Sequence, residues 1–368
     1  MRTSDFDYPL PAELIAQTPI EPRDHSRLLV LHRETGAIEH RRFYEIGDYL
    51  RADDLLVFND SRVLPARLHG HVPTGGRVEL LLLKRLSPRL WEALGRPGRR
   101  LRPSAQVGIE SPDGPPITAR VEEAREDGVR VVRLSTEEGL ERAGQVAVPP
   151  YIHTPLADPE RYQTVYARAP GSVAAPTAGL HFTPELLARL RERGVRQAFV
   201  TLHIGLDTFR PVTEEDPKQH KLHTEAFSLP LETADELNAA RREGRRIVVV
   251  GTTTVRVLEQ AAAWSERGRV EGISTPHRER CGMMPPPSGG GRETGEVRPV
   301  SGWAELFILP GYRFKLCDAL ITNFHLPRST LLMLVSAFAE RERILAAYAE
   351  AVRQRYRFYS FGDGMLVL

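Results

Sequence analysis

The chain has 368 residues, enough for two domains or one large one, and its 41% apolar and 27% charged residues are typical of a globular protein. No apolar run reaches the roughly 18 residues that span a bilayer, and the N-terminal residues lack the apolar segment of a signal peptide. The two cysteines, Cys281 and Cys317, are too few for a disulfide framework or a cysteine-rich zinc site. We therefore expect a cytoplasmic protein without membrane contact. The net charge of +2 does not by itself indicate a nucleic-acid partner.

The predicted elements change character twice along the chain. Residues 1–69 mix a short helix with apolar strands, whereas residues 70–148 contain short apolar runs separated by Gly, Pro and Asp. Such runs predict a small antiparallel β-sheet or barrel. Strands and helices alternate after residue 149, which predicts parallel strands in an α/β core. The sequence thus predicts a discontinuous α/β main domain, residues 1–69 and 149–368, with an inserted small antiparallel β-barrel domain at 70–148.

Local signals locate some helix ends within the α/β part. Thr233 and Glu236 have the spacing of a capping box at the start of a predicted helix. A helical pattern after residue 328 is expected to break near Glu340, and the chain is expected to end in a strand over residues 358–368. The segment 279–302 is rich in Pro and Gly and is expected to form a loop.

The stretch "AAPTAGLHFTPELL" places Thr177, Gly179 and His181 just before a helix start. Thr183 can be the N-cap of this helix, and Pro184 suits its first position. Free backbone N–H groups at a helix start can bind an anionic or polar ligand. Alternatively, Gly179 only turns the chain and His181 is an ordinary loop histidine.

More polar clusters follow directly after predicted core strands. Ligands of open α/β sheets bind beyond the carboxyl ends of the strands, so we expect these clusters to meet at one edge with residues 177–181. Helix capping could explain the hydroxyl groups without any ligand, but it does not explain the imidazoles. The clusters are His203, Gly205, Asp207 and Thr208; Thr252, Thr253, Thr254 and Arg256; and Asn323, His325, Arg328, Ser329 and Thr330.

A metal site is a weaker alternative. His220, His223 and Glu225 lie close together in the sequence and could bind zinc. The residues before them suggest a loop, however, and the H-E-x-x-H arrangement is absent. We therefore expect no bound catalytic metal. The G-x-S-x-G and G-x-G-x-x-G motifs are also missing, which disfavours a serine hydrolase and a nicotinamide-binding fold.

Two segments combine positive charge with aromatic rings or with few acids. Residues 84–102 contain many Lys and Arg against one acid, Glu92, and residues 353–361 alternate Arg with Tyr and Phe. Such segments can contact phosphates and stack on unpaired bases. Alternatively, the first segment is a solvated loop and the second a final strand whose aromatic residues face the core.

Several long motifs, in order and from nearly end to end of the chain, resemble one family. They are "RDHSRLLVL", "LLVFNDSRVLPARL", "RYQTVYARAPGSVAAPTAGLHFT", "TLHIGLDTFRPV", "HKLHTEAF", "VGTTTVRVLE", "LFILPGYRFK", "DALITNFHLPRSTLLMLVSAFA" and "YRFYSFGDGMLVL". The family is that of the S-adenosylmethionine:tRNA ribosyltransferase-isomerases of queuosine biosynthesis. Asp207 departs from the family pattern, which usually has Gly at this position.

This resemblance implies both a fold and a reaction. The fold is an α/β domain interrupted by a β-barrel domain. S-adenosylmethionine serves as co-substrate and donates its ribosyl moiety to 7-aminomethyl-7-deazaguanine at the wobble position of a tRNA. The product is epoxyqueuosine, and adenine and methionine are released. No metal or redox cofactor is required, and we expect a monomer whose partners are this tRNA and S-adenosylmethionine.

The same resemblance suggests roles for the clustered residues. The reaction needs a base for the ribose 5′ carbon and an acid for adenine, tasks for which histidine is suited near neutral pH. We expect His181, His203 and His325 to form this acid–base set, with roles that the sequence does not separate. The expected substrate-binding residues are Thr177, Gly179, Thr208, Thr252, Thr253, Arg256, Asn323, Ser329 and Thr330. The expected RNA-binding residues are Arg62, Arg67, Lys84, Arg85, Arg355 and Arg357.

Some alternatives stay open. Arg256 could contact phosphate or the methionine carboxylate, or could form an ion pair with Glu259. The chain could also be a non-enzymatic RNA-binding module, or a metal hydrolase that uses His220, His223 and Glu225.

Overall fold

The computed structural model describes residues 1–111, 114–125, 128–205, 212–220, 224–267 and 295–368. Asp207, Thr208, His223 and Cys281 lie outside these ranges, as does most of the Pro/Gly-rich segment. None of the helices in the described ranges is long and apolar enough to cross a bilayer.

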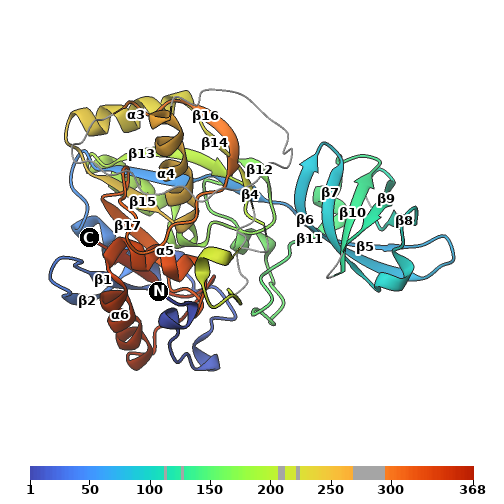
Figure 1. Ribbon diagram of the computed structural model, residues 1–368, viewed down its shortest axis with the longest axis horizontal. Helices are drawn as coiled ribbons and strands as arrows, with labels where there is room; N and C mark the ends of the chain where they lie inside the picture. Colours follow the sequence, from blue (N-terminus) through green and yellow to red (C-terminus); the bar gives the residue numbers. More distant parts are fainter. Residues whose placement is uncertain (112–113, 126–127, 206–211, 221–223, 268–294) are drawn as a thin grey trace.

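The main domain is built on a nine-stranded sheet whose order is β16-β14-β13-β3-β15-β17-β18-β1-β2 (Figure 1). Its centre is parallel, because β3 pairs in parallel with β13 and β15, and β15 pairs in parallel with β17. The predicted α/β core is therefore confirmed. The strands are β1 Arg27–Leu31, β2 Ile38–Arg42, β3 Leu55–Asn59, β13 Arg196–Leu202, β14 Glu225–Leu229, β15 Ile247–Val250, β16 Val300–Ala304, β17 Ala319–Asn323 and β18 Gly364–Val367.

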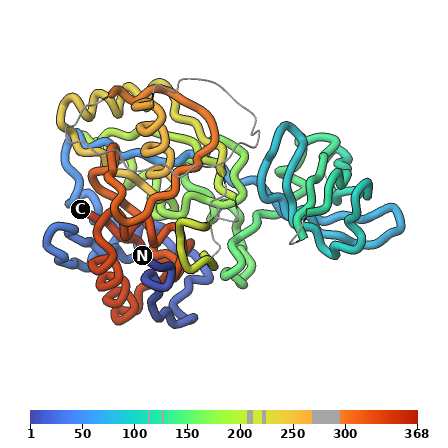
Figure 2. Tube along the Cα trace, in the orientation of Figure 1, coloured from blue at the N-terminus to red at the C-terminus, as the bar shows by residue number. Residues whose placement is uncertain are grey.

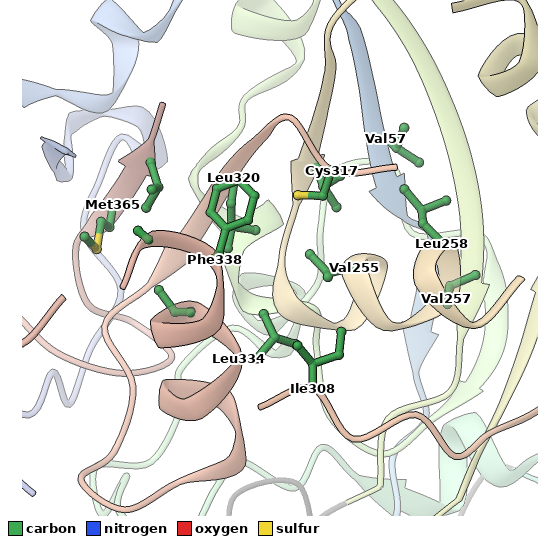
Figure 3. Close-up of a cluster of buried hydrophobic side chains, with 14 of the residues drawn as sticks. Val57, Val255, Val257, Leu258, Ile308, Cys317, Leu320, Leu334, Phe338 and Met365 are labelled. Carbon is green, nitrogen blue, oxygen red and sulfur yellow. The ribbon is translucent and has the colours of Figure 1, made fainter. Parts of the chain in front are cut away.

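Both faces of this sheet are buried, which explains why its central strands are continuously apolar. In β3, Leu55 and Val57 join the core on one face, and Leu56 and Phe58 join the core on the other. Figure 3 shows the first core, in which side chains of α4 and α5 pack around Val57 and Cys317. The helices of the main domain are α2 Pro184–Glu192, α3 Leu231–Arg242, α4 Thr252–Glu266, α5 Thr330–Ala339 and α6 Arg341–Arg353.

The helix ends test the local sequence signals. Thr183 is the N-cap of α2 and accepts a hydrogen bond from the Leu186 N–H at 3.1 Å, as predicted. The helical pattern breaks at Glu340, whose φ of 64° separates α5 from α6. The predicted capping box of α3 is wrong. That helix begins after Pro230, and the Thr233 hydroxyl donates instead to the Phe199 carbonyl at 2.6 Å.

The inserted part is a β-barrel with its own core. Its seven-stranded sheet has the order β11-β5-β6-β7-β10-β9-β8, and the pairing of β5 with β8 closes the barrel. Trp91, Leu80 and Val121 lie in its core. The predicted antiparallel barrel is confirmed, and it stands to one side of the main domain (Figures 1 and 2). The strands are β5 Arg67–His71, β6 Arg77–Ser87, β7 Leu90–Arg96, β8 Gln106–Ile109, β9 Ile117–Ala124, β10 Val129–Leu134 and β11 Gly144–Gln145, with the short helix α1 Leu140–Ala143.

A small connection links the two parts. After β3 the chain forms β4, Ser61–Val63, which pairs in parallel with β12, Ala169–Ser172. The first and last barrel strands are neighbours, with Arg67 opposite Gln145 and Leu68 opposite Gly144. The chain thus enters and leaves the barrel at adjacent points.

We predict that the barrel can be removed without unfolding the main domain. Replacing residues 67–145 by a short Gly/Ser linker should leave a chain with cooperative thermal unfolding, because the barrel core is separate and its two ends are adjacent. Circular dichroism during heating measures this, with the full-length chain as the reference. Loss of the cooperative transition in the shortened chain would show that the barrel contributes to the folding of the main domain.

Candidate functional site

A cavity of about 50 Å³ lies at the carboxyl ends of β15 and β17. Its wall comes from segments that are far apart in the sequence: residues around the 3₁₀ turn Thr177–His181, the start of α4, and the loop between β17 and α5. The structure therefore brings these polar segments together, as expected. The cavity is lined by Tyr151, Ala175, Pro176, Thr177, Ala178, Ile204, Gly251, Thr252, Thr253, Thr322, Asn323, Phe324, His325, Leu326, Ser329, Leu331, Tyr359 and Ser360.

The predicted site residues divide into those that line this cavity and those that do not. Thr177, Thr252, Thr253, Asn323, His325 and Ser329 line it. Gly179, His181, His203, Arg256 and Thr330 are absent from its wall. Of the three predicted histidines, His325 lines this cavity, His203 lines a second cavity, and His181 contacts Asn323 of the wall without being part of it.

His325 is held firmly and is neutral. Its backbone N–H donates to the Tyr348 hydroxyl at 3.0 Å, and its Nε2 lies 2.8 Å from Thr322 Oγ1. The Thr322 hydroxyl donates its own hydrogen to the Asn323 carbonyl at 3.3 Å, so it accepts from His325 Nε2–H. Burial lowers the pKa of His325 to about 3. A lone pair is thus left on Nδ1.

His181 is absent from the cavity wall and is fixed by its packing and hydrogen bonds. Its ring stacks on Phe43 with centroids 4.7 Å apart, and its Nδ1 lies 2.7 Å from Ser26 Oγ. Its Nε2 lies 3.4 Å from Asn323 Nδ2. Burial lowers the pKa of His181 to about 3, and the positive charges of Arg357 and Arg23 act in the same direction. His181 is therefore a neutral, fully hydrogen-bonded group.

His203 lines a second cavity, of about 660 Å³, which lies between barrel strand β6 and the edge of the main sheet. Its Nδ1 is buried without a hydrogen-bond partner in the described structure. The ring lies against Gly171, where a Cβ would come within 3.0 Å of Nδ1. Burial lowers the pKa of His203, and the nearby carboxylate of Asp60 opposes this shift. Ile204 lines both cavities, so the two share one wall.

The second cavity is lined by two tryptophans and by charged side chains of both signs, its acids being Glu137, Glu141 and Glu225. Lys84 and Arg85, both predicted to bind RNA, line it together with Trp91 and Trp303. The Lys84 ammonium lies 4.6 Å from the centroid of the Trp303 ring and donates to Thr224 Oγ1 at 2.9 Å. Both cations lie on strand β6, so this part of the basic segment is not a solvated loop.

Two predicted ligand contacts have structural explanations instead. The position that a Gly179 side chain would take is filled by Tyr166 and Thr164, so this glycine serves packing and not the approach of a ligand. Arg256 is buried in α4, where it forms an ion pair with Glu225 and donates to the Ala304 carbonyl at 3.3 Å. It therefore meets neither a phosphate nor Glu259.

The remaining hydroxyl groups differ in what they do. Ser329 is the N-cap of α5 and accepts from the Leu332 N–H at 3.1 Å, and it also lies on the cavity wall. Capping does not explain the threonines of α4, because that helix has Gly251 as its N-cap and no side-chain cap. The Thr254 hydroxyl donates to the Val250 carbonyl at 2.6 Å, which leaves Thr252 and Thr253 on the cavity wall.

Of the other four predicted RNA contacts, two form ion pairs, and Arg357 is half-buried and donates to the Thr18 carbonyl. Arg62 pairs with Glu160 at 2.6 Å and Arg67 with Glu79 at 3.3 Å, while Arg355 is exposed. The aromatic residues between the C-terminal arginines are buried, so they face the core and cannot stack on bases. These residues are Tyr356, Phe358, Tyr359 and Phe361. The expected strand is also shorter than predicted, because only Gly364–Val367 forms it.

Sequence reasoning missed several polar residues at the site. Asn59 ends β3 and Asp60 follows it directly, in the same pattern that identified the other clusters. Thr322 lies in β17 beside the cavity, and Ser26 precedes β1, where no sequence signal points to it. The alternative zinc site is also accounted for where it is described: His220 pairs with Glu214 at 2.9 Å, and Glu225 pairs with Arg256. No group of three possible metal ligands occurs in the described ranges.

Comparison with known proteins shows the family. A family model described as queuosine biosynthesis protein matches residues 3–367. The chain belongs to this family. It is 53% identical over 370 residues to the S-adenosylmethionine:tRNA ribosyltransferase-isomerase of Dehalococcoides mccartyi strain CBDB1, with 100% of both chains covered. It is equally 53% identical, over 373 residues and 100% of both chains, to the protein of that name from Symbiobacterium thermophilum.

A solved structure of the queuosine biosynthesis family gives a similar result. The crystal structure of S-adenosylmethionine tRNA ribosyltransferase from Thermotoga maritima is 39% identical in sequence, covers 99% of this chain and 100% of its own, and has a TM-score of 0.54. Both the barrel and the α/β domain described above thus fall within the aligned region.

The buried histidines predict acid sensitivity in this family member. The unfolded chain binds a proton to each histidine below about pH 6.5, whereas His181 and His325 stay neutral in the folded state down to about pH 3. Stability should therefore fall as the pH drops through this window. His181→Gln or His325→Gln should reduce the pH dependence of the unfolding free energy by about 1.4 kcal/mol per pH unit.

Urea unfolding at several pH values between 4 and 7 measures this slope. The control is His153→Gln, since His153 is exposed. Equal slopes in the parent protein and in both variants of the buried histidines would contradict the prediction.

Proposed function

We propose that this chain is an S-adenosylmethionine:tRNA ribosyltransferase-isomerase. In this proposal it moves the ribosyl moiety of S-adenosylmethionine onto 7-aminomethyl-7-deazaguanine at the tRNA wobble position. Epoxyqueuosine forms, and adenine and methionine leave. One observation carries this proposal: Thr177, Thr252, Asn323 and His325 meet at one cavity. The chain is also 53% identical in sequence to a relative of this name.

S-adenosylmethionine is proposed to bind at the ends of β15 and β17, where the cavity must widen to hold the whole molecule because its volume of about 50 Å³ is well below that of a ligand pocket. Hydroxyl and amide groups there suit the ribose and the methionine moiety: Thr177, Thr252, Thr253, Asn323 and Ser329. The N-terminus of α4 opens on this cavity without a side-chain cap. Its backbone N–H groups and helix dipole suit the methionine carboxylate.

His325 is proposed to act on the ribose. The sulfonium acidifies the 5′ carbon, and removal of its proton requires an unprotonated base. His325 lines the cavity, and with Nε2–H donated to Thr322 its Nδ1 is the ring nitrogen that can accept a proton. His203 lies on the other side of Ile204, in the second cavity, where it would meet the acceptor.

The tRNA is proposed to approach through the second cavity. Lys84 lies there over the ring of Trp303, and a cation with an aromatic ring can bind single-stranded RNA. Arg85 also lies there, paired with Glu137. Arg62, Arg67, Arg355 and Arg357 are proposed as further contacts with the RNA. Because Ile204 is shared, donor and acceptor would be separated by one side chain. We also propose that the enzyme acts as a monomer in the cytoplasm.

We predict that the purified protein releases adenine from S-adenosylmethionine only when the modified tRNA is present. His325→Gln should lower this rate about a hundredfold or more, since it keeps a donor for Thr322 but removes the Nδ1 base. Chromatographic measurement of adenine tests this. His32→Gln is the matched control, because His32 pairs with Glu39 away from both cavities. Binding of tRNA without adenine release would favour the RNA-binding module instead.

The reaction is also proposed to need no metal or redox cofactor. Activity should therefore persist in a strong chelator, and metal analysis of the purified protein should find no stoichiometric zinc or iron. Loss of activity in the chelator, restored by one added metal, would contradict this and revive the metal-hydrolase alternative.

A further inference from the structure

The amide of Asn323, at the end of β17, can be oriented from its neighbours. Its Nδ2 lies 3.0 Å from the Tyr359 carbonyl oxygen and 3.4 Å from His181 Nε2. A carbonyl oxygen only accepts hydrogen bonds, so the NH₂ group and not Oδ1 must face Tyr359. One amide hydrogen is donated to Tyr359, and the other points to His181.

This orientation determines the tautomer of His181. Because Asn323 Nδ2 donates, His181 Nε2 must accept, and the ring hydrogen must be on Nδ1. Nδ1–H then donates to Ser26 Oγ at 2.7 Å. Both nitrogens of His181 are occupied within the protein, and the ring is 4% exposed. A proton on Nε2 would face the Asn323 amide hydrogens and the charges of Arg357 and Arg23.

The oxygen of the Asn323 amide lacks a hydrogen-bond donor among the described residues. Asn323 Oδ1 is buried and has no hydrogen-bond partner among the described residues, although Asn323 lines the cavity. A buried acceptor without a partner destabilises a structure by roughly 1–3 kcal/mol, so such an atom needs a reason. A hydrogen-bond donor on a ligand in the cavity would supply the missing partner.

We infer that Ser26, His181 and Asn323 form a hydrogen-bonded chain that presents Asn323 Oδ1 to a hydroxyl or amine donor of the bound nucleoside. His181 is then a positioning residue that acts through Asn323, and it is not the acid or base of the reaction. This inference rests on the proposed function only for the identity of the ligand, S-adenosylmethionine.

The test is the dissociation constant of S-adenosylmethionine, measured by calorimetry on full-length variants. Asn323→Leu and His181→Phe should each weaken binding about tenfold, the scale of one lost hydrogen bond. The double variant should bind no more weakly than Asn323→Leu, because both changes remove the same contact. His181→Gln should bind like the parent protein, since its amide oxygen can accept from Asn323.

A matched control separates this effect from general destabilisation. Asn238 is a second buried Asn, bonded through its amide to the backbone N–H and carbonyl of Val297 and absent from the cavity wall. Asn238→Leu should lower the melting temperature and leave the dissociation constant unchanged. Imidazole ¹⁵N NMR of the ligand-free parent protein should show His181 with its hydrogen on Nδ1, the resonances being assigned by their loss in His181→Gln.

Two results would overturn the inference. One is an Nε2–H tautomer of His181. The other is a turnover that falls about a hundredfold in both His181→Gln and His181→Phe while the affinity for S-adenosylmethionine stays unchanged and the pH–rate profile changes. That result would make His181 an acid or base of the reaction. Failure of the parent protein to bind S-adenosylmethionine or to release adenine would contradict the proposed function, while the tautomer would still decide the role of His181.

Discussion

The side-chain amide of Asn59 bonds β3 to β13 at the point where these two neighbouring strands separate. Its Nδ2 donates to the Leu202 carbonyl at 3.0 Å, and its Oδ1 accepts from the N–H groups of Leu202 at 3.0 Å and Ser61 at 3.1 Å. These bonds replace the main-chain pairing that β3 stops offering to β13 beyond Asn59. Buried backbone groups must find partners, so β3 can leave the sheet here only because a side chain takes over.

The position of both cavities follows from this opening. Beyond Asn59 the chain runs through β4 into the barrel, while the chain beyond the end of β13 reaches Ile204, the residue that lines both cavities. Asp60 also bonds the chain at this place in the sheet. Its carboxylate accepts from the Thr201 hydroxyl at 2.6 Å and pairs with Arg168 at 2.5 Å. The connection between the barrel and the main domain is therefore fixed by side-chain bonds and is not a free linker. Its attachment places the second cavity directly beside the first one.

The sequence predicted the features that depend on local or periodic information. Alternating strands and helices indicated the parallel core, short apolar runs indicated the barrel, and Thr183 and Glu340 marked helix ends correctly. Strand direction alone was enough to bring Thr252, Asn323 and His325 to one edge.

Other features depended on contacts between distant residues and were missed. The direction of the His181 ring is set by Ser26, which lies 155 residues away in the sequence, and by Phe43. Gly179 is small because Tyr166 occupies the space beside it, which no turn signal reveals. Arg256 forms its ion pair with Glu225 on a neighbouring strand and not with Glu259 on its own helix. The family motifs indicated which residues to examine, but not which atoms meet.

The last strand of the chain has a consequence for synthesis on the ribosome. β18 lies between β17 and β1, pairing in parallel with β1 and antiparallel with β17, and its final residue bonds to Leu31. The hairpin of β1 and β2 thus cannot join the rest of the sheet until β18 has been synthesised. The barrel, by contrast, is complete at residue 145, long before β18 is made. Growing chains should therefore carry a finished barrel beside an open, aggregation-prone sheet, and a truncation before Gly364 would leave that sheet permanently divided.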